Sequence, residues 1–125
     1  MSEKVMSAEN NLSPLWEQNK TLSRLGGNNE LLSRIVTIFL SQINAKIDNF
    51  NEALAQSNMK DIQFISHSIK GTSGDVGASA LYQKASEIEQ LAKSNQLSQI
   101  QIEAPILAQI AQATIDEMRA IMKNN

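Results

Sequence analysis

Residues 32–54, LSRIVTIFLSQINAKIDNFNEAL, carry apolar residues in steps of three or four. Because an α-helix turns about 100° per residue, this spacing collects the apolar side chains on one face. Neither Pro nor Gly interrupts the segment. It therefore predicts one long helix that is capped by Asn28 and ends near Ser57. Its apolar face comprises Leu32, Ile35, Val36, Phe39, Ile43, Ile47, Phe50 and Leu54.

A shorter helix is predicted before this one. Ser13-Pro14 is a helix start signal, with Ser at the N-cap and Pro at the first helical position. Gly26-Gly27 is typical of a helix end. Residues 1–12 are polar and show no periodicity, so we expect a flexible N-terminal tail there.

Three further helices are predicted after the long one, with apolar residues within 62–69, 81–92 and 106–121. The first of them should end in a turn around residues 75–78, where glycines gather. The start of the last helix is open. A cap at Ser98 would leave Pro105 inside the helix and kink it, and the alternative is a loose turn.

No segment alternates with the period of two that marks a strand. Short connections favour antiparallel neighbours, so the prediction is an all-α fold. We expect an up-down antiparallel four-helix bundle with a short extra N-terminal helix, formed by residues 13–125 as one domain.

The composition of the 125 residues excludes several classes of protein. The chain has no Cys and one His, which excludes disulfide scaffolds, thiol chemistry and metal sites with two or more His ligands. A net charge of −2 argues against sequence-independent binding of nucleic acid. No apolar run approaches the roughly 20 residues of a membrane span, and the N-terminus lacks the apolar core of a secretory signal. These features fit a cytoplasmic protein.

The single histidine lies opposite the apolar side of its predicted helix. On a helical wheel, His67 is about 140° from Ile62, whereas Ile65 and Ile69 lie near Ile62. His67 should therefore face solvent. A lone exposed His ordinarily has no function, and that interpretation stands as the alternative.

The neighbours of His67 favour a functional site. Gly71 costs about 1 kcal/mol in a helix relative to Ala, yet it removes a side chain next to the imidazole and makes room for a large partner. Lys70 brings a positive charge suited to an anion on the ring. Phe64 is apolar on the side away from the core, which indicates a partner surface. Alternatively, the glycines only end the helix, which fits Gly77 better than Gly71.

Two other chemistries fit poorly. The segment from Gly71 to Gly77 matches neither common phosphate-loop pattern, and no strand precedes it. Ser66, Ser68 and Ser73 point away from His67 on the helix, so a serine nucleophile with a histidine base is geometrically unfavourable.

The segment from His67 to Ala78, HSIKGTSGDVGA, resembles the signature of histidine-containing phosphotransfer (HPt) domains. The segment from Leu25 to Leu32, LGGNNELL, resembles the family's sequence before its long helix. The resemblance covers roughly residues 13–123 and implies the family's four-helix bundle.

The resemblance implies that His67 accepts a phosphoryl group through Nε2 from an aspartyl phosphate and passes it to another aspartate. Lys70 would neutralise the phosphoryl oxygens, and Gly71 would clear room for the ring and the partner. Glu89, 22 residues after His67, would accept a hydrogen bond from Nδ1 and fix the tautomer. Alternatively, Glu89 is an ordinary solvated charge. The partner-binding residues would be Gln63, Phe64, Gly74 and Tyr82.

The implied partners are response-regulator receiver domains, a hybrid sensor kinase, or both. The chain would be a monomeric phosphocarrier and not an ATP-dependent kinase, without a cofactor, because the receiver would supply Mg²⁺. Two rival hypotheses are a non-phosphorylated helical adaptor for a receiver or kinase, and a dimerising histidine-kinase core.

Overall fold

The computed structural model describes residues 13–123, and this part of the chain contains helices and short connections without strands. The helices are α2 (Gln18–Arg24), α3 (Asn29–Ala55), α4 (Met59–Val76), α5 (Ser79–Lys93) and α6 (Leu97–Lys123). The all-α prediction is confirmed. The prediction of a flexible tail over residues 1–12 lies outside the described residues.

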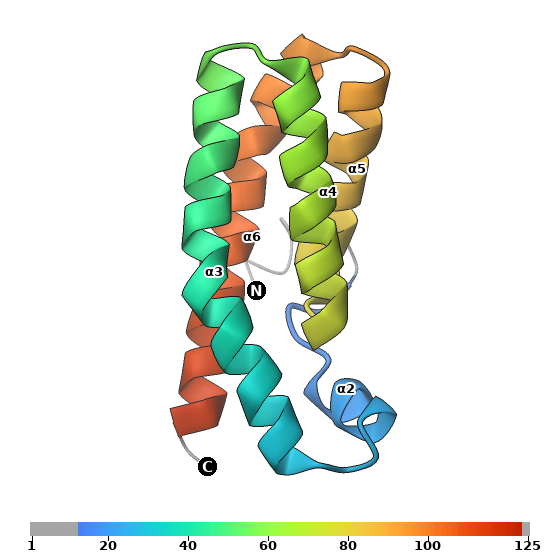
Figure 1. Cartoon of the computed structure of the whole chain (residues 1–125), viewed down its shortest axis with the longest axis vertical. Coiled ribbons are helices and arrows are strands. Elements are labelled where there is room, and N and C mark those ends of the chain that lie inside the picture. The colour runs from blue at the N-terminus through green and yellow to red at the C-terminus, as the bar shows by residue number, and fades with distance from the viewer. Residues whose placement is uncertain (1–12, 124–125) are drawn as a thin grey trace, which may run out of the picture.

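The four long helices pack in chain order. α3 packs against α4, α4 against α5, and α5 against α6, while α6 returns to contact α3. Figure 1 shows them side by side, with the three short connections at alternating ends. The short helix α2 lies at the end where α3 begins and α4 finishes.

The core is one continuous apolar cluster. Six of the eight apolar residues predicted on α3 are buried, while Ile35 and Leu54 are only partly buried against the cluster. The largest fully buried side chains come from all four long helices: Phe39, Phe50, Ile43, Ile62, Ile69, Leu81, Ile88, Ile100, Leu107, Ile115, Met118 and Val36. Burial of these faces is what holds the helices together.

Polar caps begin α3 and α4, and a left-handed glycine ends α4. The Asn28 side chain accepts a hydrogen bond from the Leu31 N–H at 2.9 Å, as predicted. Asn58 caps α4 in the same way through the Asp61 N–H. Gly77, with φ of +81°, ends α4 in the left-handed conformation that glycine adopts without strain.

The predicted start of the first helix at Ser13-Pro14 is wrong, because α2 begins only at Gln18. The backbone before it pairs with the α4–α5 turn and with the start of α5. The Ala80 N–H donates to the Pro14 carbonyl, and the Glu17 N–H donates to the Gly77 carbonyl, both at 2.9 Å.

Two other boundaries differ from prediction. α4 continues through Asp75 and Val76, so the turn is confined to Gly77 and Ala78. α6 begins at Leu97 and runs through Pro105, so no loose turn separates its two parts. Pro105 is exposed, while Ala104 next to it is buried, and the burial of this face favours a continuous helix despite the missing donor.

Candidate functional site

His67 lies on the outer face of α4. Its side chain is 69% exposed, whereas Ile62 and Ile69 on the same helix are fully buried. The orientation predicted by the helical wheel is therefore observed.

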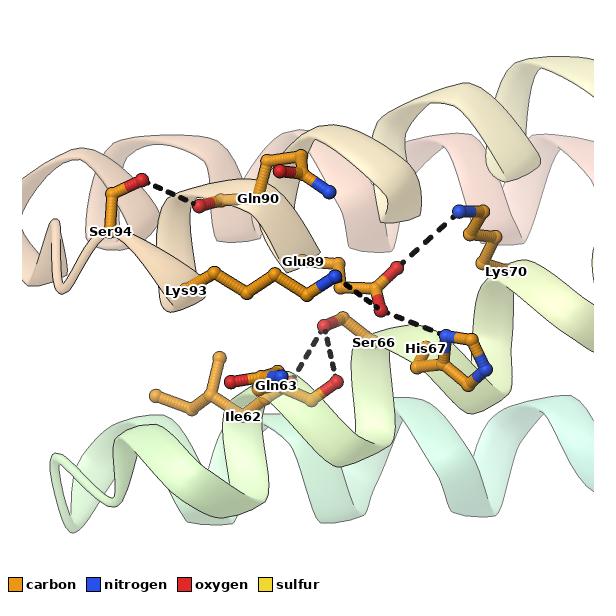
Figure 2. A network of polar contacts seen from close by, with 9 residues as sticks. All are labelled: Ile62, Gln63, Ser66, His67, Lys70, Glu89, Gln90, Lys93 and Ser94. Carbon is orange, nitrogen blue, oxygen red and sulfur yellow. Dashed lines mark hydrogen bonds and ion pairs between the residues drawn. The ribbon is translucent and has the colours of Figure 1, made fainter.

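Glu89 of α5 meets the imidazole. His67 Nδ1 and Glu89 Oε2 are 2.8 Å apart, and only 5% of the Glu89 side chain is exposed (Figure 2). The alternative in which Glu89 is a solvated surface charge is wrong. The packing of α4 against α5 explains the contact, because His67 and Glu89 are each eleven residues from Ala78 in the turn. Equal rise along the two helices brings them to the same level.

Two lysines also contact the Glu89 carboxylate. Lys70 Nζ lies 3.5 Å from Oε1, and Lys93 Nζ lies 3.8 Å from Oε2. Figure 2 shows the two ammonium groups on different sides of the carboxylate. Lys70 was expected near the site. Lys93 was missed, although its position four residues after Glu89 on a helix is a typical ion-pair spacing.

The charge state of Glu89 sets the tautomer of His67. Burial acts to raise the pKa of Glu89, but the hydrogen bond and charge of His67 and the charges of Lys70 and Lys93 outweigh it, and the pKa is lowered. An ionised carboxylate only accepts hydrogen bonds, so Nδ1 of His67 carries the proton that it donates. In the neutral ring, the lone pair is then on Nε2, the nitrogen that points away from Glu89 in Figure 2.

The glycines after His67 have different surroundings. A Cβ atom added to Gly71 would meet nothing within 4 Å, so the surface beside the imidazole is open there. A Cβ atom added to Gly74 would lie 3.3 Å from Tyr82 Cδ1. Gly74 therefore lets the Tyr82 ring pack on α4, and Lys70 Nζ lies 5.7 Å from the centre of that ring.

Two large apolar side chains are exposed on the helices that carry His67 and Glu89. Phe64, one turn before His67, is 75% exposed, and Tyr82 on α5 is 42% exposed. Gln63 is partly buried. Large apolar side chains left in solvent are a common feature of partner surfaces. The partner-binding roles of Gln63, Phe64, Gly74 and Tyr82 stay predictions.

The serines near His67 are not arranged as nucleophiles. Ser66 is fully buried, and its hydroxyl donates to the backbone carbonyls of Ile62 and Gln63 at 2.7 and 3.1 Å. Ser73 is also fully buried. The Ser68 hydroxyl accepts a hydrogen bond from Lys46 of α3.

Residues 13–123 contain no group of three or more His, Cys, Asp or Glu side chains that could hold a metal ion. Over the same residues, no helix combines the length and the apolar character needed to cross a membrane.

Comparison with known proteins gives one match. The family model for the Hpt domain matches residues 34–121, from the second turn of α3 nearly to the end of α6, and the match includes His67, Lys70 and Glu89. No curated protein and no solved structure gave a significant match. The family match covers most of the chain and coincides with the histidine site described above. The chain therefore belongs to the Hpt domain family.

Proposed function

We propose that this chain relays phosphoryl groups between receiver domains by carrying them on His67. Hpt domains in general serve as histidine phosphocarriers in phosphorelays. The observation that carries the proposal is the contact of exposed His67 with buried, ionised Glu89. It leaves a nucleophilic nitrogen facing solvent, where a second protein can reach it.

The transfer step follows from this tautomer. The Nε2 lone pair attacks the phosphorus of a receiver aspartyl phosphate, so that an N–P bond forms. The bond between phosphorus and the aspartyl oxygen breaks, and the receiver carboxylate leaves with the electron pair. The ring becomes positively charged while Nδ1 keeps its proton, and the Glu89 carboxylate, 2.8 Å away, stabilises that charge. Transfer to a second receiver is the reverse reaction.

The other groups act by position and charge, which supply most of the catalysis in phosphoryl transfer. Lys70 is one turn from His67 and would neutralise phosphoryl oxygens. Open space at Gly71 would admit the receiver. We propose that Mg²⁺ and the acidic pocket that holds it come from the receiver, and that this chain acts as a carrier without kinase activity of its own.

The scaffold we propose for this activity is an up-down antiparallel four-helix bundle of α3–α6, supported by the pairwise packing of consecutive helices. We further propose that the chain is a cytoplasmic monomer. Light scattering should then give a mass near 13.8 kDa. A dimer would instead favour a dimerising histidine-kinase core.

The decisive experiment is incubation with a receiver domain that carries labelled aspartyl phosphate. We expect the label on His67, stable to base and labile to acid. The His67→Gln variant should stay unlabelled, with an unchanged circular dichroism spectrum, because the side chain is exposed. Label that persists in this variant would refute the assignment.

A non-phosphorylated adaptor is distinguished in the same assay. It would bind the receiver with equal affinity in the wild-type and His67→Gln proteins, and neither protein would take up label.

A further inference from the structure

Lys93 belongs to the site although neither the sequence pattern nor the family resemblance assigns it a role. We propose that Lys93 is a positioning residue for phosphotransfer, which holds the Glu89 carboxylate charged and in place when Lys70 turns to the phosphoryl group. The inference rests on the proposed function of His67.

The two lysines contact different oxygens of the Glu89 carboxylate. Lys70 contacts Oε1, and Lys93 contacts Oε2, the same oxygen that accepts the hydrogen bond from His67 Nδ1. Oε1 is buried and has no hydrogen-bond partner, so the 3.5 Å ion pair with Lys70 is its nearest compensation. Loss of one lysine therefore affects a different oxygen from loss of the other.

Phosphorylation changes what Lys70 faces. A phosphoryl group brings a charge of about −1.5 to −2 and three strong acceptor oxygens. Lys70 lies on α4, three residues after His67, and its side chain is 27% exposed, so it can move from Glu89 to the new anion. Glu89 would then keep two partners, the imidazole and Lys93.

Without Lys93, the buried carboxylate would keep only the imidazole in that state. A buried carboxylate with fewer positive neighbours is more easily protonated, and a protonated one no longer stabilises the charged ring. Lys93 is 48% exposed, so its ion pair should be weak and its effect on the transfer rate modest.

The test compares Lys93→Gln, Lys93→Arg and Lys60→Gln with the wild-type protein. Lys60 lies two turns before His67 on α4, so its variant controls for a lost charge near the site. Each protein is phosphorylated with a labelled receiver at several concentrations and with phosphoramidate, a small donor that requires no docking. We expect Lys93→Gln to slow labelling about two- to fivefold with both donors, at an unchanged half-saturating receiver concentration. Lys93→Arg should restore the rate, and Lys60→Gln should leave it unchanged.

A second measurement does not require phosphorylation. Carbon-13 NMR titration of the Glu89 carboxyl should show a higher pKa in Lys93→Gln than in the wild type, because a positive charge has been removed. Lys93→Arg should keep the wild-type value. A purely structural role would lower the thermal unfolding midpoint and leave the pKa of Glu89 unchanged.

The outcomes separate the two proposals. Normal labelling of Lys93→Gln would overturn the role of Lys93, as would an effect confined to the half-saturating receiver concentration, which would mark Lys93 as a docking residue. Failure of Lys93→Arg to restore the rate would overturn the charge argument. An unlabelled wild-type protein would overturn the proposed function itself, and the carboxyl titration would still report whether Lys93 acts on Glu89.

Discussion

Glu89 combines burial with negative charge, two properties that ordinarily conflict. The structure reconciles them with one hydrogen bond and two ion pairs that arrive from α4 and α5. The charged carboxylate of Glu89 is a permanent hydrogen-bond acceptor for Nδ1 of His67. The reactive lone pair of the neutral ring is therefore on Nε2. The exposed histidine depends on a carboxylate that solvent barely reaches.

Gly71 offers a direct test of why this position has no side chain. Gly71→Ala should raise the free energy of unfolding by about 0.5–1 kcal/mol, because Ala is the better helix former and its Cβ meets nothing. Gly71→Gln should also fold, yet block phosphotransfer from a receiver by occupying the space beside the imidazole. Urea unfolding and labelling assays measure the two effects.

Gly74→Ala is the matched control for the stability effect. Its Cβ would press on Tyr82, so it should gain less stability than Gly71→Ala. A Gly71→Gln protein that transfers phosphate at the normal rate would contradict the clearance argument.

Residues 13–17, before α2, are not helical, yet hydrogen bonds hold them against the end of α4. Trp16 is buried, and its indole N–H donates to the Val76 carbonyl at 2.8 Å. The Thr21 hydroxyl donates to the same carbonyl. Both bonds satisfy one carbonyl at the end of α4 that its own helix leaves unpaired. The segment therefore supports the turn that sets α4 against α5.

Substitution of Trp16 should measure that support. Trp16→Phe loses one hydrogen bond and should cost about 1 kcal/mol, while Trp16→Ala also loses the buried ring and should cost about 3–5 kcal/mol. Urea unfolding followed by far-ultraviolet circular dichroism gives both values. A cost below about 1 kcal/mol for Trp16→Ala would mean that the segment contributes little to the turn.

The sequence predicts some helices more accurately than others. Periodicity and caps predict α3 closely, because one continuous apolar face and Asn28 specify it locally. The start at Ser13-Pro14 fails because the backbone of this segment bonds to residues sixty or more positions away, which no local pattern encodes. Pro105 misleads for a similar reason, since burial on either side of it outweighs one lost donor.

The same difference between local patterns and long-range contacts applies to the site. The wheel predicts the orientation of His67 because that depends on α4 alone. The contact with Glu89 required the family resemblance, since it depends on how two helices pack. Lys93 was missed because its ion pair with Glu89 indicates a role only once Glu89 is known to lie at the site.

At the scale of the whole molecule, an ion cluster centred on the buried side chain of Lys84 links α5 to α6. Lys84 of α5 is 3% exposed and contacts Glu103 of α6 at 2.6 Å and Glu87 of its own helix at 2.8 Å. Burial acts against the charge, but the bonds to both carboxylates outweigh it and raise the pKa of Lys84.

Glu103 should matter more than Glu87 for stability. Glu103→Gln weakens the bond between helices and should cost about 1–3 kcal/mol, while Glu87 is 43% exposed and Glu87→Gln should change stability by less than about 1 kcal/mol. Chemical denaturation of the two variants compares them directly. Equal costs would contradict the assignment of Glu103 as the stronger link.

The pH dependence follows from the same cluster. A raised pKa means that the folded protein holds the Lys84 proton more tightly than the unfolded chain does. The stabilisation is complete below the ordinary value of 10.5 and is lost as the pH rises through the folded value. Denaturation in alkaline buffer should show this decline, and Lys84→Met should reduce it.

His67 and Glu89 are each eleven residues from Ala78 along the chain. The position of the α4–α5 turn therefore decides which residues of the two helices lie side by side. One residue added between His67 and the turn would shift the imidazole by about 1.5 Å along the helix and rotate it by about 100°. No substitution at the site would have occurred, yet the ring would lose its acceptor. The proposed phosphotransfer thus constrains the number of residues between His67 and the turn as well as the side chains at the site.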